Sequence, residues 1–105
     1  MTSKEYEKFI AEKVAPRLTN YTDLAKHGTI RYGKSNKWLG GVRWEHQIDV
    51  SIHGDQDILL VECKCWFRNN VPATAFLTMW ARVLDISNGP HAKGKKVRGA
   101  LVTWG

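Results

Sequence analysis

The spacing of apolar residues changes several times along the chain, and each change marks a predicted element. Apolar side chains recur at helical spacing after the capping sequence "TSKE", which predicts a first helix that ends near residue 15, just before Pro16. Extended segments follow at 29–32, 45–53 and 58–66. A second helix with a broad apolar face begins near Pro72 and stops at "NGP", residues 88–90, and a last strand covers 97–104.

Residues 58–61 are apolar at four consecutive positions, which is typical of a central strand covered on both faces. A chain of 105 residues is long enough for one domain with its own core, and no repeat or linker divides it. We therefore predict a single α/β domain over 1–105, with the order α-β-β-β-α-β and a central mixed sheet flanked by helices.

Charged residues interrupt the two longest strands, within "QIDVSIHGDQDILLVECKCW" at 47–66. If the turn at 54–57 places His53 opposite Ile58, then Asp49 lies opposite Glu62, and Lys64 points to the same face. Two carboxylates at that separation repel each other, and a divalent cation with oxygen ligands, Mg²⁺ or Mn²⁺, would relieve the repulsion. The alternative is a cross-strand salt bridge on a solvated face, and a register shift by one residue would separate the acids.

The overall charge favours an anionic partner. The net charge is +6 and the isoelectric point is near 9.6, and nucleic acid is the commonest partner of such a basic domain. No apolar run approaches the roughly 20 residues of a membrane span, and the N-terminus lacks a secretion signal. We expect a cytoplasmic protein without membrane association.

Several segments together resemble one nuclease superfamily. Asp49 followed by Glu62-Cys63-Lys64 resembles the D…(D/E)-x-K signature of the PD-(D/E)XK nucleases, which have the restriction-endonuclease-like fold. "EHQIDVSI", "LLVECKCW" and "GALVTWG" are similar to Mrr-like restriction nucleases, and the first two also to archaeal Holliday-junction resolvases. The chain departs from the pattern at Ile48, where the family name has proline, and at Glu62, where Mrr-like proteins often have glutamine. It also ends after the fourth strand, so we interpret it as a minimal member or as the catalytic part of a longer protein.

The resemblance implies roles for the motif residues. Asp49, Glu62 and the backbone carbonyl of Cys63 would bind Mg²⁺ (or Mn²⁺), and Lys64 would orient or activate the attacking water and stabilise charge on the phosphate.

Two further residues are predicted to complete this site. Many relatives add a carboxylate from the first helix, and Glu7 flanks the apolar stripe of that helix, which makes it the preferred candidate over Glu45. Gln47 alternates with Asp49 and is predicted to share its face, where its amide would bind a water or a phosphate.

Two basic segments are predicted to contact nucleic acid, and the alternative for each is a solvated loop. They contain Arg31, Lys34, Lys37 and Arg43, interleaved with aromatic residues, and Lys93, Lys95 and Lys96 before the last strand. Trp38 and Trp44 are alternatively core or dimer contacts.

Two other motifs are set aside. Cys63 and Cys65 have no second Cys/His pair to complete a zinc site and are assigned to core packing. Residues 28–35 match the sequence pattern of a phosphate-binding loop, G-x-x-x-x-G-K-S. The residues that follow do not predict the start of a helix, which such a loop requires, so no nucleotide cofactor is expected.

These observations lead us to expect a Mg²⁺-dependent endodeoxyribonuclease of the restriction type. It would act as a homodimer, because one such site cuts one strand and cleavage of a duplex needs two. Two alternatives stay open. One is a structure-specific nuclease of the Holliday-junction resolvase type, and the other is a non-catalytic nucleic-acid-binding module with the same fold.

Overall fold

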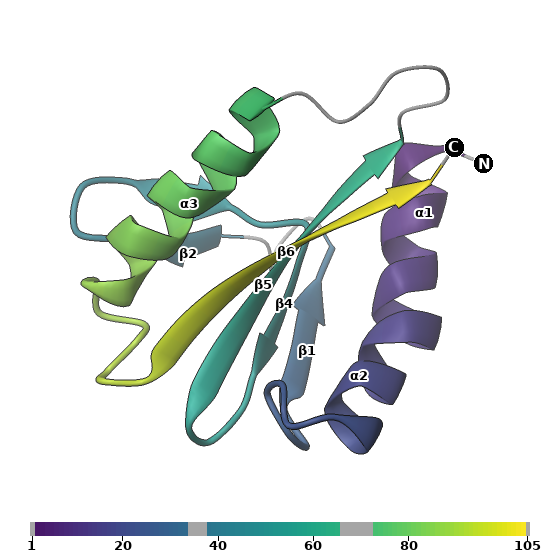
Figure 1. Cartoon of the computed structure of the whole chain (residues 1–105), viewed down its shortest axis with the longest axis horizontal. Helices are drawn as coiled ribbons and strands as arrows, with labels where there is room; N and C mark the ends of the chain where they lie inside the picture. Colours follow the sequence, from purple (N-terminus) through teal and green to yellow (C-terminus); the bar gives the residue numbers. More distant parts are fainter. Residues whose placement is uncertain (1, 34–37, 66–72, 105) are drawn as a thin grey trace.

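The computed structural model describes residues 2–33, 38–65 and 73–104. Its central feature is a four-stranded mixed sheet with the order β1-β4-β5-β6 (Figure 1). The strands are β1 (Thr29–Tyr32), β4 (Val50–His53), β5 (Asp57–Cys65) and β6 (Lys96–Trp104). The first three pair antiparallel and β6 runs parallel to β5, so the expected mixed α/β architecture is confirmed.

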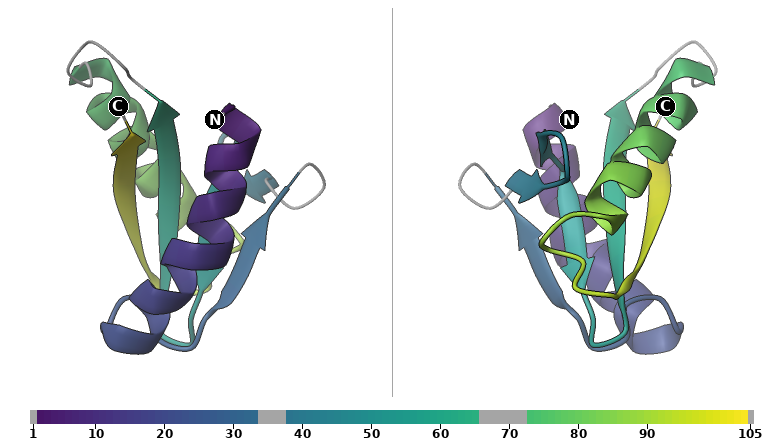
Figure 2. Two further views of the ribbon diagram at one scale, coloured as in Figure 1. Left: turned by 90° about the vertical axis from the view of Figure 1, so that its right-hand side faces the viewer. Right: turned by 90° about the vertical axis from the view of Figure 1, so that its left-hand side faces the viewer.

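A long helical segment covers one face of the sheet (Figure 2). It consists of α1 (Ser3–Phe9), the π-helical turn η1 (Ile10–Val14) and α2 (Ala15–Tyr21). The predicted cap is confirmed, because the Thr2 side chain accepts a hydrogen bond from the Glu5 N–H. The predicted end at residue 15 is wrong. Pro16 follows the wider π-turn and lies in the first turn of α2. A backbone N–H in the first turn of a helix has no intrahelical acceptor, so the helix continues although proline lacks that group.

The other face of the sheet is covered by α3 (Ala73–Ser87) and by a small hairpin of β2 (Trp38–Gly40) and β3 (Glu45–Gln47). Two apolar cores result, one on each face of the sheet. Leu59 and Val61 of β5 enter the core beneath α1, whereas Ile58 and Leu60 enter the core beneath α3. The central, doubly covered position predicted for residues 58–61 is therefore confirmed.

The second predicted strand, 45–53, is divided into β3 and β4 by a bend at Ile48 and Asp49. Ile48 is buried in the core beneath α3, and Val50 is buried in the core beneath α1. Residues two apart in a regular strand share a face, so these two burial sites require the bend. After the bend the predicted register holds, with His53 opposite Ile58 and Val50 opposite Val61.

Candidate functional site

Asp49 and Glu62 meet on the α3 face of the sheet, immediately beyond the β4–β5 ladder. Asp49 lies outside the ladder, but its Oδ2 accepts a hydrogen bond from the Cys63 N–H across the strand gap, at 2.9 Å. The Glu62 side chain shares a hydrogen bond with Asp49, and the residue is only 4% exposed. The predicted pairing of these two acids therefore holds, although the bend, and not a regular ladder, places Asp49.

Burial and the neighbouring acid make Glu62 hard to ionise. Removal from solvent is the largest cause of the change, the negative charge of Asp49 adds to it, and together they raise the pKa of Glu62 to about 7. The positive charges of Arg82 and Lys64 oppose this effect but do not cancel it. A carboxyl group in this position is stabilised either by a proton or by a further cation.

Arg82 belongs to this site and was not anticipated from the sequence. It lies on α3 between the buried residues Met79 and Ile86, and its Nη1 donates to Glu62 Oε1 at 2.5 Å. A signal was present, because position 82 follows Met79 by three and precedes Ile86 by four, which places it on the helix face that contacts the sheet. A charged residue at such a position needs a partner, and here the partner is Glu62.

Lys64 lies two residues beyond Glu62 on β5 and shares its face. Both line a small cavity of about 220 Å³ between the sheet and the start of α3. The remaining lining residues are Thr74, Ala75, Thr78, Met79 and Arg82. The cavity is thus lined by one acid and one lysine from the sheet and by an arginine and two hydroxyl groups from α3, an arrangement suited to an anionic group beside a bound cation.

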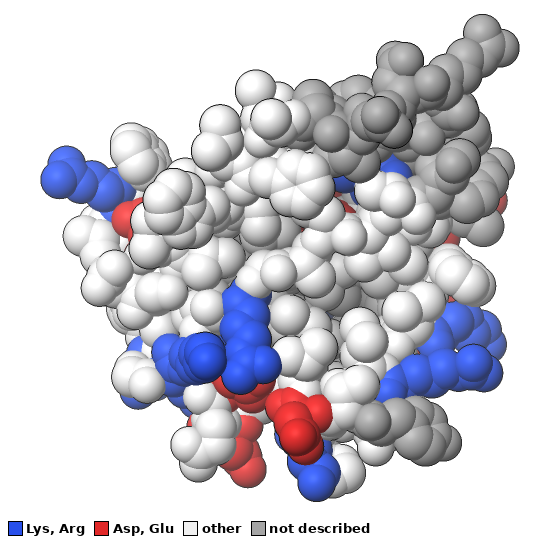
Figure 3. Space-filling model, in the orientation of Figure 1, with Lys and Arg blue, Asp and Glu red and all other residues white. Residues whose placement is uncertain are grey.

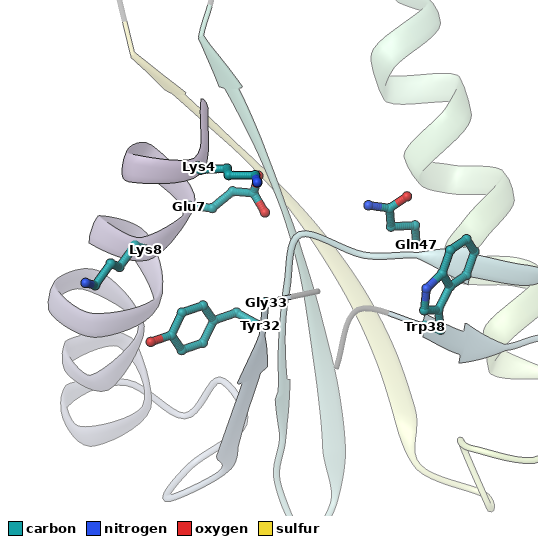
Figure 4. Close-up of a pocket in the computed structure, with 7 residues that line it drawn as sticks. All are labelled: Lys4, Glu7, Lys8, Tyr32, Gly33, Trp38 and Gln47. Carbon is teal, nitrogen blue, oxygen red and sulfur yellow. The ribbon is translucent and has the colours of Figure 1, made fainter. Parts of the chain in front are cut away.

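Glu7 and Gln47 lie apart from this cavity. They line a different cavity of about 680 Å³ between the helical segment and the β2–β3 hairpin (Figure 4). Its other lining residues are Lys4, Lys8, Tyr32, Gly33 and Trp38. The helix that carries Glu7 packs on the sheet face to which Val61 points, whereas Glu62 points to the opposite face. Gln47 was predicted to share a face with Asp49, but the bend after Gln47 interrupts the strand alternation on which that prediction depended. Glu45 is exposed on the hairpin.

The predicted basic contacts divide between two regions. Lys34 and Lys37 lie outside the described residues, and Arg43 is exposed on the hairpin loop. Lys96 begins β6 opposite Asp57, five residues along β5 from Glu62, or about 17 Å at strand spacing. Those predicted contacts that the structure describes therefore do not form one surface around the acids.

A cationic group at that far end surrounds His53. Burial is the main reason that the pKa of His53 falls to about 4, and the charges of Arg31, Lys95 and His91 add to it. Lys95 is also used structurally, since its Nζ donates to the Gly54 carbonyl at 2.7 Å. Lys93 is exposed in the loop before β6.

Asp85 of α3 anchors the hairpin and was also not anticipated. Its carboxylate accepts hydrogen bonds from the backbone N–H groups of Arg43 and Trp44, and His46 Nε2 lies 2.7 Å from Oδ2. A Cβ at Gly41 would stand 2.1 Å from the same oxygen, so any larger residue there would have to displace the Asp85 carboxylate. The pKa of Asp85 is lowered, mainly by the hydrogen bond with His46. This contact holds the chain before Asp49 against α3.

The donor set can be tested for a divalent cation. Within the described ranges, no group of three or more His, Cys, Asp or Glu side chains is placed to hold a metal ion. Mg²⁺ does not need such a cage, because it usually keeps several waters and binds through one or two carboxylates together with substrate phosphates. Asp49 and Glu62 fit that requirement, and the role of the Cys63 carbonyl stays a prediction. The Cys63 side chain packs against the core beneath α1, as expected.

No family model, curated protein or solved structure matches this chain in the three comparisons made. Among the helices of the described ranges, none has the length and apolar character that a membrane crossing requires.

Proposed function

We propose that the protein is a metal-dependent DNA endonuclease with a restriction-endonuclease-like core, and that Asp49, Glu62 and Lys64 form its active site. The observation that carries the proposal is the pairing of Asp49 with a buried Glu62 whose pKa is raised to about 7. Two acids that share a hydrogen bond could instead share a divalent cation. Lys64 and Arg82 line the same site, where their positive charges would face the phosphate of a substrate bound to that cation.

The residues of the site then have distinct tasks. Asp49 and Glu62 would hold Mg²⁺ or Mn²⁺, which when bound supplies an activated water and neutralises charge on the phosphate. Lys64 orients the attacking water and stabilises the negative charge that develops on the phosphate oxygens. Arg82 forms an ion pair with Glu62 in the free protein and donates to a phosphate oxygen when the carboxylate has another partner.

A plasmid-nicking assay with matched variants tests the proposal. Asp49→Asn and Lys64→Ala are expected to abolish Mg²⁺-dependent nicking of supercoiled DNA, a loss of at least about 100-fold. Asp55→Asn and Lys26→Ala change the same residue types at exposed positions and should retain activity. Nicking that persists in the first pair, or that disappears equally in the second, would contradict the assignment.

One observation favours a second candidate, a non-catalytic nucleic-acid-binding module. The Arg82–Glu62 ion pair already gives the buried carboxylate a cationic partner within the protein, a contact that a structural role alone would explain. This candidate predicts salt-sensitive DNA binding with no cleavage by the unmodified protein in Mg²⁺ or Mn²⁺. It also predicts no stabilisation of the fold by either ion. Arg82→Ala should weaken binding under the nuclease proposal but should chiefly destabilise the fold under this one.

A further inference from the structure

The outer flank of α3 exposes a stripe of large apolar side chains, which form part of the broad apolar face predicted for this helix. Met79 and Ile86 are buried against the sheet and Val83 is partly buried. The stripe consists of Phe76, Leu77, Trp80 and Leu84, with exposed fractions of 58%, 59%, 62% and 49%. Their spacing places them along one side of the helix. Contiguous apolar surface of this kind marks an interaction site.

The position of α3 directs this flank past the edge of the sheet. Met79 and Val83 lie directly over β6, where their side chains approach the site of a Cβ on Gly99 to 2.6 and 3.0 Å. Arg82 reaches in the other direction, to Glu62 on β5. With about 100° of rotation per residue, Trp80 must then point away from β5, beyond β6. Figure 2 shows α3 running beside this last strand.

The strand beneath the flank is the end strand of the sheet. β6 pairs with β5 on one side, and within the described ranges no strand pairs with its other edge. It is nine residues long, and its charged residues, Lys96 and Arg98, stand near its start. A long edge without charges in its second half is a ready template for another strand.

We propose that this face binds a second copy of the chain, through antiparallel pairing of the two β6 strands about a two-fold axis perpendicular to the sheet. Such an axis keeps both α3 helices on the same face, so that their apolar flanks meet above the new strand pair. The interface is self-complementary, as a two-fold dimer requires. The inference does not depend on the proposed catalysis.

Charge and area both favour a second copy as the occupant. Two molecules of net charge +6 repel each other, so a surface without charged side chains favours their close approach. In Figure 3 the surface over α3 is largely free of charged side chains, whereas blue side chains lie in the lower centre, where β6 begins. The four side chains expose roughly 400 Å², and an edge about 30 Å long adds backbone and side-chain area, which reaches the roughly 600–1,000 Å² per partner of a specific interface.

Two measurements test this interface. Sedimentation velocity at protein concentrations from about 1 to 100 µM gives the mass of the species, and hydrogen exchange at the lowest and highest concentration shows which amides become protected. We expect a species of 24 kDa, twice the 12.0 kDa chain, for the unmodified protein and for Trp44→Glu, which alters an equally exposed tryptophan on the hairpin. Trp80→Glu should sediment as a monomer. Amide protection should rise with concentration in β6 and stay constant in β1, the other edge strand.

Three results would overturn the inference: a monomer of the unmodified protein at the highest concentration, a dimer of Trp80→Glu, or concentration-dependent protection in β1 instead of β6. Circular dichroism establishes that each variant is folded. If Trp80→Glu is not folded, Leu84→Lys on the same stripe is tested in its place, and dimerisation of that variant would equally contradict the interface.

Discussion

Replacing Glu62 by glutamine should stabilise the fold at alkaline pH while removing the function. Glutamine keeps the shape and the hydrogen-bonding capacity of the side chain but has no charge to bury. The carboxyl group has a pKa of about 7 in the folded protein against 4.5 as its ordinary value. Each unit of difference corresponds to about 1.4 kcal/mol, so ionised Glu62 lowers the free energy of unfolding by about 3 kcal/mol.

The sign of the effect follows from the raised pKa. Between about pH 4.5 and 7 the folded state holds more protons than the unfolded state, so the stability contributed by the protonated group is lost as pH rises through this window. The unmodified protein should therefore lose about 3 kcal/mol relative to Glu62→Gln between pH 4 and pH 8, and the two proteins should converge below pH 4.5. Subtracting the free energy of unfolding of one protein from that of the other at each pH removes the contribution of the titratable groups that both proteins share.

Urea denaturation of both proteins at pH 4, 6 and 8 measures the effect, because the midpoint shifts at constant slope when stability alone changes. Addition of Mg²⁺ at pH 8 should raise the midpoint of the unmodified protein only, since a ligand that binds the folded state stabilises it by mass action. Stability curves that stay parallel from pH 4 to 8 would refute the reasoning that Glu62 is buried beside a second acid.

Two further predictions concern stability. His53 has a folded pKa of about 4, below its ordinary 6.5, so the unfolded state takes up a proton first and stability falls as pH falls through this window. Between pH 7 and pH 4 the unmodified protein should lose roughly 1–2 kcal/mol more free energy of unfolding than His53→Gln, a figure that allows for partial solvent screening of His53. Denaturation curves of both proteins at the two pH values measure the difference. Gly41→Ala should cost about 1–3 kcal/mol, because its Cβ would meet the Asp85 carboxylate, and the cost should shrink in an Asp85→Ala background. Equal costs in both backgrounds would show that the clash lies elsewhere.

The extended segments were predictable because their evidence is local. The apolar run at 58–61 fits only a strand covered on both faces, and the register that places His53 opposite Ile58 follows from the length of the turn at 54–57. That register brings Asp49 towards Glu62, but Asp49 lies outside the ladder, and the bend that places it was not predicted. The end of the first helix was not predictable from Pro16, because a π-turn within the helix accommodates the proline.

Long-range packing decided the rest. The sequence by itself determined an α/β domain with two acids and a lysine on one face of a hairpin, since these depend on strand alternation and on residues close along the chain. Only the tertiary structure showed Arg82 against Glu62, Asp85 against the hairpin, and Glu7 on the opposite face of the sheet. Helical periodicity states which residues share a side of α3, but the placement of the helix over the β6 edge decides which of them are buried.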